Sequence, residues 1–190
     1  MRGLFYSALM VLVFTACEVE LDNPVSSQGD SIFKIKEGTH SSNRMPESFE
    51  GNELHFTATF DSSAVYQTIQ SSNQADINKL MGFSDCASHH HENSARFGWR
   101  WYNDQLEILA YCYINGQRSY EYITSVNLNS THEYKLVSVD DKYVFTVDNT
   151  IEIVIPKVYV CESGSNYMLF PYFGGDEVAP HDITVRIDKG

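Results

Sequence analysis

The sequence predicts an all-β protein, built as an antiparallel β-sandwich. Apolar and polar residues alternate over many short segments, which is the two-residue period of half-buried strands. Turn residues separate these segments, and Asn115-Gly116 is the strongest hairpin signal because both residues tolerate positive φ. Helical periodicity is almost absent from the chain. A chain of this kind buries its strands by packing two antiparallel sheets together.

The chain begins with a segment that predicts export. Arg2 is followed by an apolar and small run over residues 4–16, which is too short to span a bilayer as a stable helix. The run ends in Phe14-Thr15-Ala16-Cys17, which resembles a bacterial lipobox. This resemblance implies that a signal peptide of residues 1–16 is removed and that Cys17 carries lipid. The alternative is an ordinary secretory signal with a chance cysteine.

Residues 17–31 are acidic and polar, cannot form a core, and predict a tether. Acidic residues directly after a lipid-bearing cysteine resemble the export signals of Bacteroidetes-type surface lipoproteins. That resemblance implies an outer-membrane lipoprotein that faces the cell exterior. The alternative is a solvated linker without such an address. Residues 32–190 then form one β-sandwich domain, an ordinary size for a single core.

The formal net charge of the 190-residue chain is −12. A strongly acidic protein repels nucleic acid and anionic lipid surfaces, so nucleic acid is excluded as a partner. The expected contact with a membrane is the lipid anchor at Cys17. The same charge gives no long-range attraction for acidic polysaccharides.

The pattern predicts the elements of the domain in order. Three early strands are expected at 32–35, 54–60 and 65–69, and a single helical turn at 76–81. Later strands follow in quick succession, at 95–101, 106–114, 117–124, 134–139, 142–147, 150–155, 167–170 and 183–187. Asp140-Asp141 and Asp148-Asn149 are weaker turn signals between three of them.

The hairpins assign side chains to the two sides of one sheet. A two-residue loop at 115–116 pairs Tyr111 with Tyr120, and a four-residue loop at 102–105 pairs Arg96 with Tyr111. The core side then carries Phe97, Trp99, Trp101, Leu106, Ile108, Ala110, Cys112, Ile114 and Ile123. The other side, named the Tyr/Arg face, carries Arg96, Arg100, Glu107, Leu109, Tyr111, Tyr113, Arg118, Tyr120 and Tyr122.

The Tyr/Arg face is the candidate binding surface, and its polar and aromatic members are the candidate ligand-binding residues. Sugar rings stack their apolar side on aromatic rings, while their hydroxyl groups need hydrogen-bond partners. Tyrosine and arginine supply both, and few rotamers are lost on binding. The alternative is an ordinary solvent-facing sheet, because both residue types suit exposed strands.

Cys86, His89 and His91 are candidate zinc ligands, but a tetrahedral site needs a fourth ligand and the spacing matches no standard zinc pattern. A polar loop is the better interpretation, so the metal ligands and the catalytic residues stay unassigned. His90 lies within reach of the Tyr/Arg face if strand alternation continues backwards, and a histidine there suits acid–base chemistry.

Three cysteines, Cys86, Cys112 and Cys161, remain for the exported domain. In an oxidising compartment they allow one disulfide and one free thiol. Their spacing does not identify the pair, and we favour Cys86 with Cys161. Cys112 lies within an apolar strand pattern and suits a small buried hydrophobe.

Two segments, 83–101 and 169–187, carry a family resemblance. They resemble a family of bacterial surface lipoproteins with a concanavalin A-like, or laminin-G-like, jelly-roll domain, for which no chemistry is assigned. Residues 143–149 also resemble the Val-Asp-Gly hairpin of laminin-G-like sandwiches, with Asn149 in place of the glycine. The resemblance implies a jelly roll that binds glycans or cleaves them.

The sequence lacks the signatures of the enzymes with this fold. The Glu-x-Asp-x-x-Glu strand of jelly-roll glucanases is absent, as are the Arg-x-Glu-x-Arg and Gln-Ile-His strands of jelly-roll alginate lyases. No nucleophile elbow or phosphate loop occurs, and no cofactor is expected. We therefore expect a surface lipoprotein that binds a glycan. The alternatives are a lyase acting on uronate-containing polysaccharides, with arginine neutralising the carboxylate and tyrosine or histidine taking the proton, and a non-catalytic adhesin or scaffold subunit.

Overall fold

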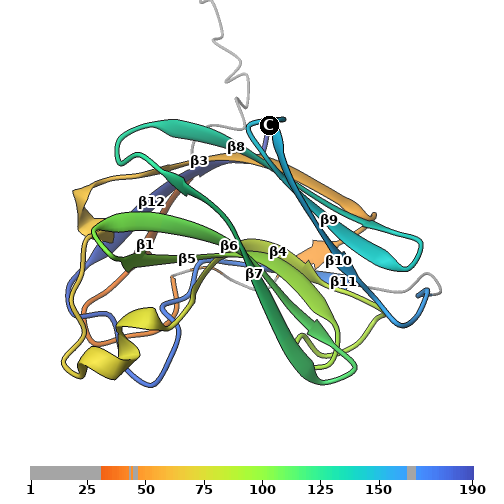
Figure 1. The fold of residues 1–190 in the computed structure, drawn as a ribbon, viewed down its shortest axis with the longest axis horizontal. Coiled ribbons are helices and arrows are strands. Elements are labelled where there is room, and N and C mark those ends of the chain that lie inside the picture. Colours follow the sequence, from red (N-terminus) through yellow and green to blue (C-terminus); the bar gives the residue numbers. More distant parts are fainter. Residues whose placement is uncertain (1–30, 43, 45–46, 162–165) are drawn as a thin grey trace, which may run out of the picture.

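The computed structural model describes residues 31–42, 44, 47–161 and 166–190. Over these residues the chain forms two antiparallel six-stranded sheets that pack face to face (Figure 1). The predicted signal peptide, Cys17 and the tether up to residue 30 lie outside the described residues. Within the described residues, no helix has the length and apolar character needed to cross a membrane.

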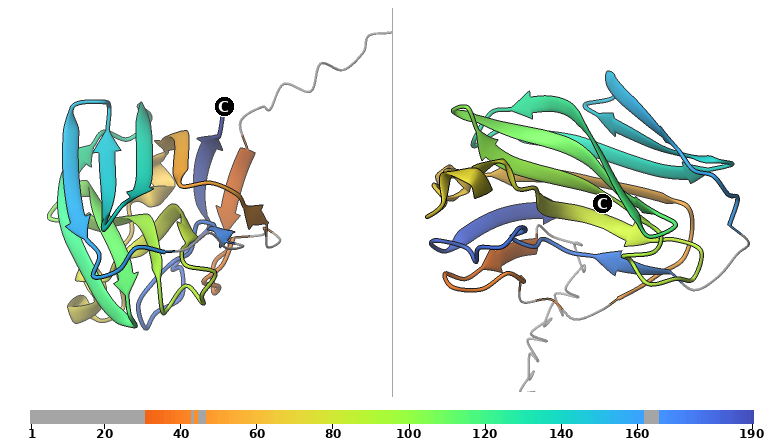
Figure 2. Two further views of the ribbon diagram at one scale, coloured as in Figure 1. Left: turned by 90° about the vertical axis from the view of Figure 1, so that its right-hand side faces the viewer. Right: turned by 60° about the horizontal axis from the view of Figure 1, so that its bottom comes forward.

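Each sheet combines a run of consecutive strands with strands that are distant in sequence (Figure 2). The first sheet has the order β1-β12-β3-β8-β9-β10, with strands at β1 Ser31–Ile35, β12 Ile183–Asp188, β3 Glu53–Phe60, β8 Thr131–Val139, β9 Lys142–Val147 and β10 Ile151–Pro156. The second sheet has the order β2-β11-β4-β5-β6-β7, with strands at β2 Ser48–Phe49, β11 Asn166–Leu169, β4 Asn78–Ser84, β5 Ser94–Tyr102, β6 Gln105–Ile114 and β7 Gln117–Val126. Two short 3-10 turns, η1 Ser62–Ala64 and η2 Ser71–Ala75, connect β3 to β4.

The core lies between the two sheets and is rich in aromatic rings. Trp99 is fully buried and contacts Phe60 of the opposite sheet and Tyr66 of the segment between η1 and η2. Phe97 makes an edge contact with Tyr134 of the opposite sheet. The predicted core side is confirmed: its members are buried except Trp101 and Ile114, which are partly buried and pack against the same cluster.

The hairpin between β6 and β7 is confirmed, with Asn115 at φ 48° and Gly116 at φ 75°. The predicted four-residue loop at 102–105 is wrong. Tyr102 pairs with Gln105, and the turn is the two residues Asn103 and Asp104, which both have positive φ. Asparagine and aspartate tolerate that conformation, so this turn is one more of the tight hairpin type.

The predicted strand at 65–69 is wrong, although its side chains alternate between exposed and buried. This segment crosses the edge of the sandwich, and side chains satisfy its backbone instead of a neighbouring strand. The backbone N–H of Thr68 donates to Gln74 Oε1 at 2.9 Å, and that of Ile69 donates to Glu177 Oε2 at 2.8 Å. Alternation reports burial on one side and does not report whether a partner strand exists.

The predicted helical turn at 76–81 is also wrong, because β4 begins at Asn78 and the 3-10 turn η2 ends at Ala75. The register between β4 and β5 shifts between Lys79 and Gly82, which marks a β-bulge. The irregularity breaks the two-residue period, so the consecutive buried residues Leu80 and Met81 do not alternate as a regular strand requires.

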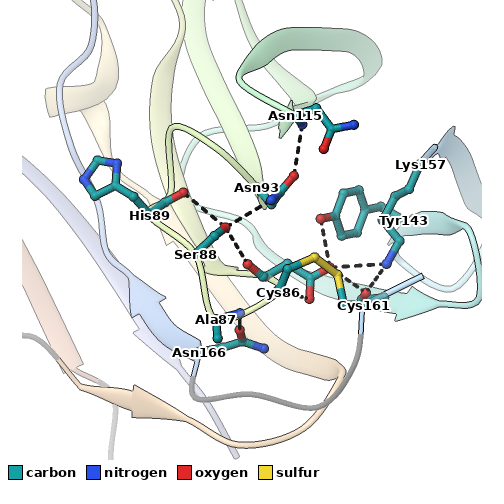
Figure 3. Close-up of a disulfide and its surroundings, with 12 residues drawn as sticks. Cys86, Ala87, Ser88, His89, Asn93, Asn115, Tyr143, Lys157, Cys161 and Asn166 are labelled. Carbon is teal, nitrogen blue, oxygen red and sulfur yellow. Dashed lines mark hydrogen bonds and ion pairs between the residues drawn. A yellow bond between two sulfur atoms is a disulfide. The ribbon is translucent and has the colours of Figure 1, made fainter. Parts of the chain in front are cut away.

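The favoured disulfide, Cys86 with Cys161, is confirmed (Figure 3). Cys112 is a buried free thiol. Beside the disulfide, the carboxylate of Asp85 is buried. Its Oδ2 accepts hydrogen bonds from Tyr143 Oη at 2.9 Å, Ser138 Oγ at 3.0 Å and Lys157 Nζ at 3.2 Å. This network ties the loop after β4 to the opposite sheet.

Candidate functional site

The Tyr/Arg face lies on the outer side of the second sheet, as the register predicts. Arg96 of β5 pairs with Tyr111 of β6, and Tyr111 pairs with Tyr120 of β7. Both predicted pairs are confirmed. A bulge in β7 places Leu109 opposite Tyr122 and Ile108 opposite Thr124, so Ile123 is the extra residue, and its side chain is buried.

Part of this face is covered, so it is not the flat open platform that the sequence suggests. Leu109 and Tyr111 are buried and form a small apolar cluster with Ile77. The side chain of Ile77 can pack over β5 at this point only because Gly98 has no side chain. A Cβ at Gly98 would lie 2.5 Å from Cγ2 of Ile77.

Two of the predicted binding residues are satisfied by each other. Arg100 Nε donates to Glu107 Oε2 at 2.6 Å, and Arg100 Nη1 donates to the carbonyl oxygen of Ala75 at 2.8 Å. The guanidinium also lies over the ring of Tyr102. Arg100 and Glu107 therefore anchor η2 to the sheet, and their charges cancel locally.

Arg96 has no such partner. Its side chain is buried, its Nε has no hydrogen-bond partner, and no carboxylate in the described part of the chain pairs with it. The guanidinium lies 5.4 Å from the centre of the Tyr111 ring. Burial lowers the pKa of Arg96 below its ordinary value, but an arginine remains charged at neutral pH. A buried cation without a counter-ion is costly and is typical of a site that receives an anion.

Lys79 is a second cation beside Arg96, and the sequence did not identify it. Its Nζ lies 4.8 Å from the centre of the Tyr111 ring and donates to the carbonyl oxygen of Ile77 at 2.7 Å. Burial, and then the charges of Arg96 and Arg118, lower the pKa of Lys79 to about 8. The amine is therefore mostly protonated at neutral pH and titrates just above it.

A small pocket opens beside Lys79 and Tyr111. It has a volume of about 90 Å³ and is lined by Lys79, Tyr111, Arg118 and Tyr120, with Ile77 and Asp76 on the other side. About three water molecules fill such a volume, so a carboxylate or sulfate group fits. Arg118 is exposed at its rim, with its guanidinium 6.0 Å from the Tyr120 ring.

The exposed rings of the face lie on the edge strand β7. Tyr120 is 53% exposed and Tyr122 is 49% exposed, whereas Tyr111 is 4% exposed. The rings of Tyr120 and Tyr122 are therefore available for stacking. The ring of Tyr111 is buried and contacts the cationic groups of Lys79 and Arg96. Tyr113 is intermediate and contacts the ring of Tyr111.

The histidine loop borders the same face. The ring of His91 lies 5.1 Å from that of Tyr113, and His90 Nδ1 lies 2.9 Å from Tyr167 Oη. Cys86, expected as a possible zinc ligand, is in the disulfide and cannot serve. Burial is the main cause that lowers the pKa of both His90 and His91, and the charge of Arg96 lowers it further.

Tyr172 completes the surroundings of Lys79. The two residues bond backbone to backbone, from Lys79 N to Tyr172 O at 2.8 Å and from Tyr172 N to Lys79 O at 3.0 Å. The segment 169–182, which is part of the stretch that carries the family resemblance, therefore borders the site. The sequence carried no signal for this contact, because 93 positions separate the two residues in the numbering of the chain.

A larger pocket, of about 590 Å³, lies at one end of the sandwich around Trp101, Gln74, Asp104 and His181. Two of its polar side chains are already hydrogen-bonded: Gln74 Nε2 donates to the carbonyl oxygen of Trp101 at 2.7 Å, and His181 Nε2 bonds the carbonyl oxygen of Ser63 at 2.8 Å. It holds no unpaired buried charge. We therefore assign the candidate site to the Tyr/Arg face, despite its smaller pocket.

No family model matches the sequence, and a search of the curated proteins finds no match. The fold, in contrast, is shared with many solved structures. Alginate lyase AlyC3 aligns with a TM-score of 0.58 at 10% identity, over 86% of this chain and 74% of that protein. The catalytic domain of a laminarinase from Thermotoga petrophila RKU-1 aligns with a TM-score of 0.57 at 10% identity, over 84% and 75%.

A laminarinase from Flavobacterium sp. UMI-01 aligns with a TM-score of 0.55 at 13% identity, over 84% of this chain and 76% of that protein. Identities this low show a common fold and no more. The predicted fold class, an antiparallel β-sandwich of the concanavalin A-like jelly-roll type, is confirmed.

Proposed function

We propose that this protein binds an acidic glycan, such as a uronate-containing polysaccharide, through the Tyr/Arg face. The observation that carries the proposal is Arg96, a buried guanidinium with no counter-ion in the described residues. An unpaired buried ion costs several kcal/mol, and a ligand carboxylate or sulfate that reaches it recovers that free energy. Arginine suits this role because its planar fork matches a carboxylate.

Lys79 and Arg118 extend the positive cluster. Both lack an ion pair in the described part of the chain, and both line the pocket beside Tyr111. The net charge of −12 gives no long-range steering toward an acidic polymer, so recognition depends on contacts at short range. Three cations on one face of an acidic protein are a local arrangement that favours an anion at that place.

The exposed tyrosines supply the remaining contacts of a glycan site. Tyr120 and Tyr122 present rings along the edge strand next to the pocket, where sugar rings can stack. The likeness in fold to an alginate lyase and to laminarinases adds support, because those proteins act on glycans. That likeness does not identify the sugar.

The test is calorimetric titration of the protein with a polyuronate and with the same polymer after its carboxyl groups are reduced to alcohols. We expect binding of the first and at least about tenfold weaker binding of the second. Arg96→Lys should lose affinity, whereas Lys142→Gln, a cation of β9 on the other sheet, should not. Equal binding of both polymers would show a glycan site that has no preference for anions and would contradict the proposed role of Arg96. Failure to bind either polymer would contradict the proposal as a whole.

The proposed location is the outer membrane, with Cys17 as the lipid anchor and the domain outside the cell. The support comes from the sequence: the Phe14-Thr15-Ala16-Cys17 box and the acidic residues that follow it. A surface position suits a glycan-binding domain, because extracellular polymers are too large to cross the membrane unaided.

A polysaccharide lyase is the second candidate, and one observation favours it. Proton abstraction next to a carboxylate needs a base with a pKa near the working pH, and the pKa of Lys79 is lowered to about 8. In that reaction the free amine takes the proton, a carbon–carbon double bond forms, and the glycosidic oxygen leaves with a proton from a tyrosine hydroxyl. His90, with a pKa lowered to about 4, is too weak a base for this role. Ultraviolet absorbance of unsaturated products separates a lyase from a binding module.

A further inference from the structure

The loop between β4 and β5 brings three consecutive histidines together. His89, His90 and His91 each offer a ring nitrogen, and these atoms lie within 4.8 Å of one another. The ring centres are 4.3 Å apart for His89 and His90, and 4.4 Å apart for His90 and His91. Consecutive side chains of a strand point to opposite sides, so only a turn conformation can gather them.

The loop is held rigidly in this conformation (Figure 3). The disulfide from Cys86 to Cys161 ties its start to the segment after β10, and Asp85 N donates to Asn93 O at 2.9 Å across its base. Asn93 Oδ1 accepts the backbone N–H of Asn115 at 3.0 Å, and this fixes its far end to the β6–β7 hairpin. Side chains held this way lose little further freedom on binding a ligand.

One of the three rings already has the outer hydrogen bond that is common for metal-bound imidazoles. His90 Nδ1 lies 2.9 Å from Tyr167 Oη, which leaves its Nε2 for a ligand.

We propose that His89, His90 and His91 form a binding site for a divalent transition-metal ion of the Zn²⁺ or Cu²⁺ class. Imidazole nitrogen is a preferred ligand of these ions. All three ligands are nitrogen donors, whereas Ca²⁺ and Mg²⁺ prefer carboxylate and other oxygen ligands. Zinc–nitrogen bonds of about 2.0 Å place tetrahedral ligand nitrogens about 3.3 Å apart, so nitrogens that lie within 4.8 Å of one another must close by at most about 1.5 Å, within the reach of side-chain rotation. Three ligands leave one position for water or an anion.

The site differs from the predicted set of Cys86, His89 and His91, since the disulfide removes the cysteine and His90 takes its place. The neighbouring charge of Arg96 opposes a cation, so we expect weaker affinity than that of a closed structural zinc site. The inference stands independently of glycan binding, because it concerns the metal ion alone.

The test is titration of the full chain, purified without a polyhistidine tag, with Zn²⁺ by calorimetry and with Co²⁺ by visible absorption. We expect one ion per chain in both. The double variant His89→Ala/His91→Ala should bind each ion at least about tenfold more weakly. His55→Ala/His132→Ala removes two histidines outside the cluster and should bind as the wild type does.

Circular dichroism verifies that each variant is folded, and Zn²⁺ should raise the melting temperature of the wild type but not that of His89→Ala/His91→Ala. Undiminished binding by that folded variant would overturn the proposal. So would the absence of binding to the wild type, or loss of binding only in the control variant.

Discussion

Lys79 provides a titration test of the proposed site. Its pKa is lowered to about 8, chiefly by burial and then by the charges of Arg96 and Arg118. The lowered pKa means that the amine is about 90% protonated at about pH 7 and about 3% protonated at about pH 9.5. If an acidic glycan binds only the protonated form, its affinity falls by up to roughly 30-fold over this range, or about 2 kcal/mol.

The assay is calorimetric titration of a uronate oligosaccharide at several pH values in one high-capacity buffer series at constant salt. Lys79→Met keeps most of the side-chain volume and has no titrating amine, so its affinity should be lower at pH 7 and nearly flat up to pH 9.5. Uniform affinity of the wild type across the range would refute the reasoning. The same fall in Lys79→Met would assign the pH dependence to another group.

Three further predictions concern packing, the buried ion pair and the anchor. Trp99→Ala should lower the free energy of unfolding by about 3–5 kcal/mol, because the ring is fully buried against Phe60 and Tyr66; a denaturant midpoint like that of the wild type would contradict its place in the core. Lys157→Met should lower the free energy of unfolding by about 3–5 kcal/mol, because it leaves the buried Asp85 carboxylate without its cation. The matched control in the same denaturation experiment is Lys135→Met, which should lower it less because the partner Glu53 is exposed. Cys17→Ser should abolish lipid attachment and release the protein from the membrane fraction, measured by metabolic lipid labelling; equal labelling of the variant would exclude Cys17 as the anchor.

Local patterns predicted the sheet that carries the site. The two-residue period and the Asn115-Gly116 turn determine which residues of β5, β6 and β7 share a side, and the register follows from them. Both are properties of neighbouring residues. The inward position of Trp99 and the outward position of Arg96 were therefore predictable from the sequence.

Contacts between distant segments were not predictable in the same way. Lys79 reaches the face from β4, where a bulge interrupts the alternation that would have revealed it. The side chain of Ile77 packs over Gly98 to reach Tyr111. This contact depends on the absence of a side chain at Gly98 of β5. The lack of a hydrogen-bond partner for Arg96 Nε within the described ranges likewise depends on the whole surroundings of the guanidinium and not on its neighbours in sequence.

The choice of site variants follows from the same contrast. The alternation made Tyr111 the natural residue for testing ring stacking, but Tyr111 is buried and its removal would disturb the Ile77 cluster. Tyr120, which is 53% exposed, tests stacking without that effect. A folded Tyr120→Ala variant should bind a glycan with at least about 1 kcal/mol less free energy, a loss that calorimetry resolves.

The most direct test of the central claim is the nuclear magnetic resonance signal of the Arg96 Nε–H group during titration with a uronate oligosaccharide, assigned by its disappearance in Arg96→Lys. Because this Nε has no hydrogen-bond partner among the residues that the structure describes, a ligand carboxylate held by the guanidinium must change its surroundings. We predict a progressive shift of this signal that saturates at the affinity found by calorimetry, and no shift with the carboxyl-reduced oligosaccharide. An Arg96 signal that stays in place while the uronate binds would contradict the account.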